Sequence, residues 1–80
     1  MSADEAVILM TLETIRPDAN YAASRNYVED GLLDSLDIVS LVTELEQSFG
    51  VCIDGIDIVP ENFITATAIA VLVNRSEKRP

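Results

Sequence analysis

The side chain best suited to chemistry in this sequence is the hydroxyl of Ser35, at the predicted start of a helix. Asp34 precedes it and is the stronger N-cap, because its carboxylate accepts hydrogen bonds from free N–H groups and its charge suits the positive end of the helix. The Ser35 hydroxyl is then free to face solvent. A phosphodiester there would lie at a helix N-terminus, which favours an anion, although Asp34 and Asp37 would repel it. Serines at helix starts usually act only as caps, so the residues alone make this site possible and no more.

Few other side chains could form a catalytic or metal site. The chain has one cysteine, Cys52, and no histidine. No disulfide framework or Ser-His-Asp triad can therefore form within it, and a zinc or haem site is disfavoured. Cys52 follows the turn at Gly50, and we expect it to be a small buried hydrophobic residue. The two acids beside Gly55 lack the ligand series of a calcium loop. We predict no catalytic residue and no metal site, and expect the protein not to be an enzyme.

The charge of the chain is strongly acidic and unevenly distributed. Its 14 acidic and 5 basic residues give a net charge of -9, and no base lies between residues 26 and 74. Such a surface repels nucleic-acid phosphates and anionic membranes and attracts basic protein surfaces. We expect no nucleic-acid partner, although a merely solvated acidic surface would have the same composition. The acids in the base-free stretch are Glu29, Asp30, Asp34, Asp37, Glu44, Glu46, Asp54, Asp57 and Glu61.

Hydropathy favours a globular protein that does not insert into a membrane. Hydrophobic residues make up 49% of the 80 residues, which indicates a folded chain. The first residues are acidic and no basic segment precedes a long apolar stretch, so no signal peptide is predicted. The longest apolar-rich run, Ile64 to Val73, is too short to span a bilayer. We expect one cytoplasmic domain over residues 1–80, with its core at about 3–74 and a polar, frayed tail at 75–80.

Periodicity and capping residues predict an all-α chain with three main helices and one short helical turn. Residues 17–33 show no sustained period and form a long first loop, and loops of this length are often functional or mobile. The predicted segments are a helix from the Ser2–Glu5 capping box to about Arg16, a helix from Ser35 to Phe49, a turn near residues 60–63 and a helix from about Ala66 to Asn74, capped by Thr65.

One leucine does not fit the apolar face of the helix that begins at Ser35. The core-facing residues cluster within about 100° of arc, and Leu36 lies about 160° from their centre. Leu36 is therefore either covered by the long loop or offered to a partner. The residues of the apolar face are Ile38, Leu41, Val42, Leu45 and Phe49.

The run from Gly31 to Asp37, Gly-Leu-Leu-Asp-Ser-Leu-Asp, resembles the attachment motif of the phosphopantetheine-dependent acyl carrier proteins. The core of that motif is Asp-Ser-Leu, with the serine at the start of the second helix. The acidity, the long first loop and the order of the helices are also similar to that family, over about residues 3–74. The resemblance implies an acyl-carrier-like four-helix bundle, with three main helices, one short helix and a long loop between the first two.

The resemblance also implies a cofactor and site residues. Ser35 would carry a 4′-phosphopantetheine arm, placed there from coenzyme A by a phosphopantetheinyl transferase. The thiol of the arm, and not Cys52, would hold an acyl or aminoacyl cargo as a thioester. Leu36 would be the apolar centre of a weak, electrostatically steered docking surface. The residues assigned to partner recognition are Asp34, Leu36, Asp37, Val39, Glu44 and Glu46, the two glutamates on an acidic outer face of the helix.

The resemblance further suggests a carrier subtype and its partners. Members used in fatty-acid synthesis often have Gly-Ala before Asp-Ser-Leu and an acid five residues after the serine, whereas this chain has Leu33 and Ser40. The subtype is more similar to carriers of D-alanyl or aminoacyl groups, or of specialised pathways. A monomeric carrier would visit a loading ligase and downstream enzymes with basic docking patches. The residues also allow an alternative, an acidic helical module that is never modified and binds a basic protein through the Ser35 helix.

Overall fold

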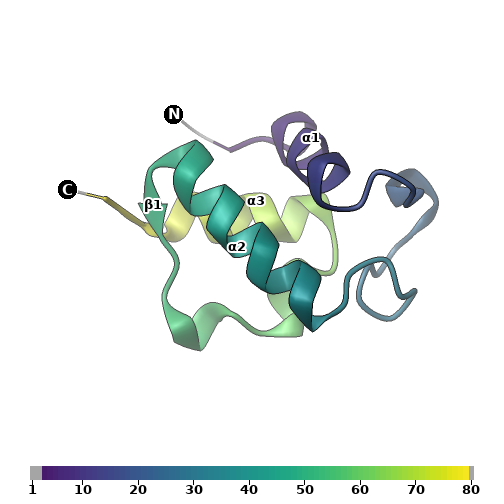
Figure 1. Cartoon of the computed structure of the whole chain (residues 1–80). Helices are drawn as coiled ribbons and strands as arrows, with labels where there is room; N and C mark the ends of the chain where they lie inside the picture. The colour runs from purple at the N-terminus through teal and green to yellow at the C-terminus, as the bar shows by residue number, and fades with distance from the viewer. Residues whose placement is uncertain (1–2, 80) are drawn as a thin grey trace.

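Three α-helices carry most of the regular structure in this computed structural model, which describes residues 3–79 (Figure 1). The helices are α1 (Glu5–Ile15), α2 (Ser35–Phe49) and α3 (Ala66–Arg75). The short elements are the 3₁₀-helices η1 (Tyr21–Ala23), η2 (Gly55–Asp57) and η3 (Pro60–Phe63) and the strands β1 (Val51–Cys52) and β2 (Glu77–Lys78). α1 packs against both α2 and α3, and η3 packs against α3.

Side-chain caps define where the α-helices begin. Asp4 accepts a hydrogen bond from the Val7 N–H at the start of α1 (3.0 Å), and Thr65 accepts one from the Ala68 N–H at the start of α3 (3.1 Å). The predicted cap of α3 and the predicted bounds of α2 are confirmed. The cap predicted for α1, Ser2, lies outside the described residues. Asp4 is the N-cap of α1 instead, and its carboxylate is an acceptor of the preferred type.

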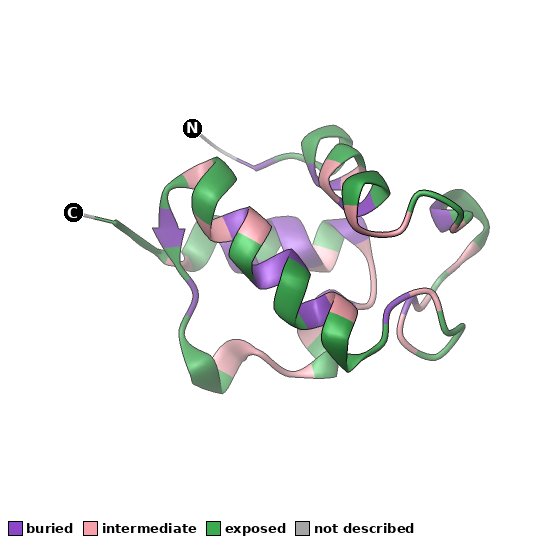
Figure 2. Cartoon of the chain, in the orientation of Figure 1, coloured by how far each residue is buried: buried purple, intermediate pink, exposed green. Residues whose placement is uncertain are grey.

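The buried faces of the helices point toward one core (Figure 2). The apolar face predicted for α2 is confirmed: Ile38, Leu41, Val42 and Leu45 are buried, and Phe49 is half-buried against them. Burying a large aliphatic or aromatic side chain contributes about 1.5–3 kcal/mol, so these contacts fix the orientation of α2. The other core residues are Ala3, Ile8, Leu12, Tyr21, Tyr27, Leu33, Val51, Ile53, Phe63, Ala66, Ile69, Ala70, Leu72 and Val73.

Two tyrosines hold the long loop between α1 and α2 against the helices. The Tyr21 hydroxyl lies 3.0 Å from the carbonyl oxygens of both Leu12 and Arg16, and burial raises the pKa of Tyr21 above its ordinary value of 10.0. The Tyr27 ring packs edge-on against Tyr21 with 5.1 Å between centroids. Its hydroxyl accepts a hydrogen bond from the Ala66 N–H at the start of α3 (3.2 Å). The loop is thereby tied to α1 and α3, and the path of the chain into α2 is set.

The prediction of a frayed C-terminal tail is wrong. Residues Glu77–Lys78 form β2, which pairs antiparallel with β1. Beyond the strand, the Arg79 N–H donates to the Gly50 carbonyl oxygen at 2.8 Å. Residues 77–79 are ordered because their backbone groups pair with the segment that follows α2, a contact between residues far apart in the sequence.

The prediction that Cys52 is buried is also wrong, because Cys52 is exposed. Side chains alternate between the two faces of a strand. In β1, Val51 faces the core and Cys52 faces solvent. Pairing with β2 therefore turns the thiol outward.

The structure confirms a mostly helical chain of the size of a small bundle. The short turn predicted near residues 60–63 is η3, a single 3₁₀-helix. The two-stranded sheet was not predicted. Between residues 3 and 79, none of the helices has the length and apolar character needed to cross a bilayer.

Gly50 ends α2 in the left-handed region, with φ 63° and ψ 42°. A Cβ added at Gly50 meets no atom within 4 Å, so alanine would add only the backbone cost of that conformation. We expect Gly50→Ala to lower the free energy of unfolding by about 1 kcal/mol, measured by urea denaturation. Gly55 has the same open space without a positive φ, so Gly55→Ala is the matched control and should change little. Equal losses in the two variants would contradict this explanation.

Candidate functional site

Ser35 is the first residue of α2, and its side chain is exposed. The N–H groups of Ser35 and Leu36 come before the first intrahelical hydrogen bond, which the Ile38 N–H donates to the Asp34 carbonyl at 3.0 Å. These two N–H groups therefore belong to the free donors at the positive end of the helix. The hydroxyl and the free donors lie in one turn, as the sequence predicted.

Asp34 and Asp37 cap α2 reciprocally. The Asp37 N–H donates to Asp34 Oδ1 at 2.8 Å, and the Asp34 N–H donates to Asp37 Oδ2 at 3.0 Å. This is a capping box in which an aspartate holds the position that glutamate or glutamine usually holds. The prediction that Asp34 caps the helix is confirmed. The Ser35 hydroxyl takes no part in this cap, so it remains available for other chemistry.

Arg16 lies against this capping box, and the sequence did not predict it there. Its Nη1 lies 2.8 Å from Asp37 Oδ2, across 21 positions of sequence. The hydrogen bond from the Asp34 N–H lowers the pKa of Asp37 below its ordinary value of 3.8, and the Arg16 guanidinium adds to this effect, whereas partial burial opposes it. No local sequence signal could have found the contact, because it depends on how the long loop returns from α1 to α2.

The lowered pKa of Asp37 predicts a pH dependence of stability. The carboxyl binds its proton more weakly in the folded than in the unfolded chain. Its contribution is therefore complete above the ordinary pKa of 3.8 and is lost as the pH falls through the folded-state value. We expect the stability difference between wild type and Asp37→Asn, measured by urea denaturation, to shrink between about pH 5 and pH 2. A difference that stayed constant over this range would contradict the assignment.

Leu36 and Val39 expose apolar side chains on the outer side of α2. They are 76% and 61% exposed, and exposed segments alternate with buried ones along α2 in Figure 2. The long loop does not cover Leu36, so the first of the two explanations for its position is excluded. Uncovered apolar residues beside a free hydroxyl are features that a docking protein can bind.

The two predicted recognition glutamates point to different sides of α2. Residues two positions apart on a helix point about 160° away from each other. Glu46 Oε2 accepts a hydrogen bond from the Ile53 N–H at 3.0 Å, which ties the glutamate to the segment after α2. Glu44 lines a groove between α1 and α2 together with Met10 and Thr14. The acids therefore flank the outer side of the helix instead of forming one acidic face, and their part in recognition stays a prediction.

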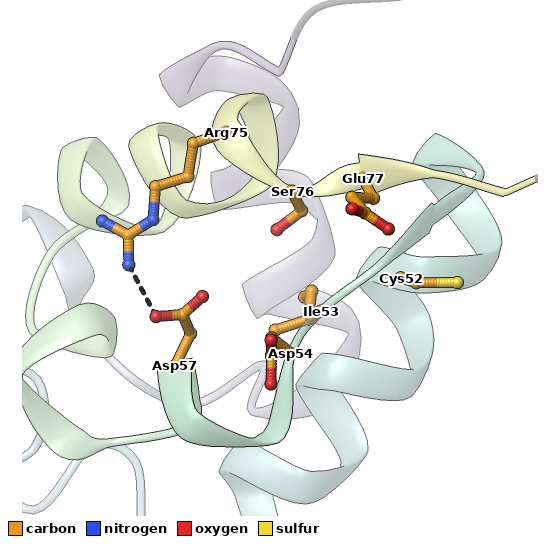
Figure 3. A pocket seen from close by; sticks show the side chains of 7 residues that line it. All are labelled: Cys52, Ile53, Asp54, Asp57, Arg75, Ser76 and Glu77. Carbon is orange, nitrogen blue, oxygen red and sulfur yellow. Dashed lines mark hydrogen bonds and ion pairs between the residues drawn. The ribbon is translucent and has the colours of Figure 1, made fainter.

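A pocket of about 370 Å³ lies beside β1, after the C-terminal end of α2 (Figure 3). The basic residue that lines the pocket is already paired, because Arg75 Nη2 lies 3.3 Å from Asp57 Oδ1. The Cys52 thiol points away from this ion pair. Within the part of the chain that the structure describes, no three His, Cys, Asp or Glu side chains are grouped as around a metal ion. We assign no chemistry to this pocket. Its lining residues are Cys52, Ile53, Asp54, Asp57, Arg75, Ser76 and Glu77.

The structure thus brings four predicted site residues, Asp34, Ser35, Leu36 and Asp37, into the first turn of α2 and its cap. Val39 follows within the next turn, whereas the two glutamates lie further along the helix. In comparisons with known proteins, the chain matches no family model, no curated protein and no solved structure at the significance required.

Proposed function

We propose that this chain is a carrier protein that holds an acyl or aminoacyl group as a thioester on a 4′-phosphopantetheine arm attached to Ser35. The observation that carries the proposal is the exposed Ser35 side chain in the first turn of α2, outside the capping box. The motif resemblance from Gly31 to Asp37 supports the same assignment. In this proposal, the three α-helices and η3 correspond to the four helices of a carrier bundle.

The first turn of α2 is chemically suited to a phosphodiester on Ser35. The free N–H groups and the helix dipole favour an anion at this end. The carboxylates of Asp34 and Asp37 oppose it, but both accept backbone hydrogen bonds, and Asp37 is also paired with Arg16. The arm, when attached, supplies the thiol that carries the cargo. The chain supplies the attachment hydroxyl and the surface around it, and no catalysis.

The same turn supplies the contact for partner enzymes in this proposal. Leu36 and Val39 form an exposed apolar centre. Asp34 caps the same turn, and Glu44 lies further along α2 at the groove with α1; both acids attract basic patches in this proposal. With a net charge of -9, the chain would be steered toward basic surfaces without tight binding. Weak contacts suit a monomeric cytoplasmic carrier that visits a phosphopantetheinyl transferase, a loading ligase and downstream enzymes in turn.

The test is enzymatic loading of the unmodified protein. We expect incubation with coenzyme A, Mg²⁺ and a broad-range phosphopantetheinyl transferase to add the mass of one arm to the wild type and none to Ser35→Ala. The exposed Cys52 could form a mixed disulfide with coenzyme A, so the assay is repeated under reduction and in Cys52→Ser. That variant has no thiol before loading and should have one afterwards. No gain in the wild type, or the same gain in Ser35→Ala, would overturn the proposal.

The alternative function is an acidic interaction module that is never modified. The exposed Leu36 and Val39 would serve it equally well, because both functions need a docking surface on α2. The intact mass of the protein purified from its own host separates the two. Material that carries the arm supports the carrier, whereas uniformly unmodified material supports the module.

A further inference from the structure

Arg16 is held at the junction of α1 and the long loop by its own backbone. Its N–H donates to the Leu12 carbonyl oxygen at 2.8 Å and closes α1. Its carbonyl oxygen lies 3.0 Å from the Tyr21 hydroxyl, at the first turn of the loop. The backbone of Arg16 is thus fixed from both sides, and its side chain starts from a defined place. From there it reaches the first turn of α2.

The guanidinium of Arg16 and the capping box share one oxygen atom. Asp37 Oδ2 accepts both the Arg16 Nη1–H at 2.8 Å and the Asp34 N–H at 3.0 Å. The other half of the box, from the Asp37 N–H to Asp34 Oδ1, is 2.8 Å long. A change at Arg16 therefore acts on the group that closes the turn around Ser35. No other base in residues 3–79 has an ion pair in this turn.

We infer that Arg16 is a positioning residue for the modification of Ser35, acting through Asp37. It holds the capping box closed, which keeps Asp34 as the cap and the serine hydroxyl free. Arg16 also neutralises the charge of Asp37, one of the two carboxylates beside the Ser35 hydroxyl. This lowers the repulsion that the anionic coenzyme A meets when it approaches that hydroxyl. The inference rests on the proposed function and adds a residue to that site which neither the motif nor the helix pattern contains.

The test compares transfer rates in charge-matched variants. We expect Arg16→Gln to slow the initial rate of arm transfer to Ser35 about fivefold, which corresponds to about 1 kcal/mol, the upper end for an exposed ion pair. Arg16→Lys keeps the charge and should recover most of the rate. Arg75→Gln is the matched control, because it removes the same charge and breaks the ion pair with Asp57 on another part of the molecule. Its rate should equal that of the wild type.

A second readout separates positioning from a general loss of stability. NMR titration of the Asp37 carboxyl should give a higher pKa in Arg16→Gln, and a pKa close to that of the wild type in Arg16→Lys and Arg75→Gln. The melting temperature should fall by similar small amounts in Arg16→Gln and Arg75→Gln, because each variant loses one surface ion pair. Only Arg16→Gln should lose transfer rate.

The outcomes distinguish this inference from the proposed function. If the wild type is loaded and Arg16→Gln is loaded equally fast, the role of Arg16 is wrong and the carrier function stands. Equal slowing in Arg16→Gln and Arg75→Gln would assign the effect to net charge and overturn the inference as well. If the wild type is never loaded, both the carrier function and the role of Arg16 fail together.

Discussion

Replacing Phe63 with alanine is expected to lower the free energy of unfolding by about 3–5 kcal/mol. The phenyl ring is 0% exposed and belongs to η3, which packs against α3. The neighbouring Asn62 donates its side-chain N–H to the Asp57 carbonyl oxygen at 2.7 Å, which holds η3 in place and limits collapse around the cavity. A chain of 80 residues has an unfolding free energy of only about 4–12 kcal/mol. This one substitution should therefore remove a large part of it.

Urea denaturation followed by circular dichroism measures this effect. Ile56 provides a control in the neighbouring η2, because its side chain is 81% exposed. Ile56→Ala should change the free energy of unfolding by no more than about 0.5 kcal/mol. The loss of unfolding free energy in Phe63→Leu should lie between those of Phe63→Ala and Ile56→Ala, because leucine refills part of the cavity. A loss below about 1 kcal/mol in Phe63→Ala would contradict the burial of the ring in the core.

Replacing Leu36 with alanine is expected to reduce transferase kcat/KM for Ser35 by about tenfold, with the fold unchanged. The side chain is 76% exposed and buries no core surface, so its removal should leave the urea midpoint where it is. In the carrier function proposed here, the same exposure makes Leu36 the apolar centre of the enzyme contact. Residues that are fully desolvated at the centre of an interface contribute more to binding than those at its rim. The loss should therefore appear in function and not in stability.

Met10→Ala is the matched control for Leu36→Ala. Met10 is 68% exposed, but it lies on α1, in the groove that Glu44 also lines. Its truncation removes exposed apolar surface of similar size away from Ser35, so kcat/KM should stay at the wild-type value. Equal loading rates for wild type and Leu36→Ala would remove Leu36 from the docking surface. Equal losses in both variants would point to a nonspecific effect of surface hydrophobicity.

The sequence by itself determined where α2 begins and ends, where α3 begins and which face of α2 is buried. The signals are local: Asp34 and Thr65 accept hydrogen bonds from N–H groups three residues ahead, and Gly50 adopts the left-handed conformation that ends a helix. The position of Leu36 off the apolar face follows from the 3.6-residue period alone. The free hydroxyl of Ser35 follows from the stronger cap beside it. These features of the candidate site could therefore be predicted without knowledge of the tertiary contacts.

Only the tertiary structure decided the contacts that link distant segments. Pairing of β1 with β2 ordered residues 77 and 78 and turned Cys52 outward. The return of the long loop brought Arg16 to Asp37. A hydrogen bond from the Ile53 N–H in the segment after α2 engaged the Glu46 carboxylate. Each of these is a hydrogen bond or an ion pair between different segments. Such contacts form only when packing of the core brings the segments together, so local propensity and periodicity carry no signal for them.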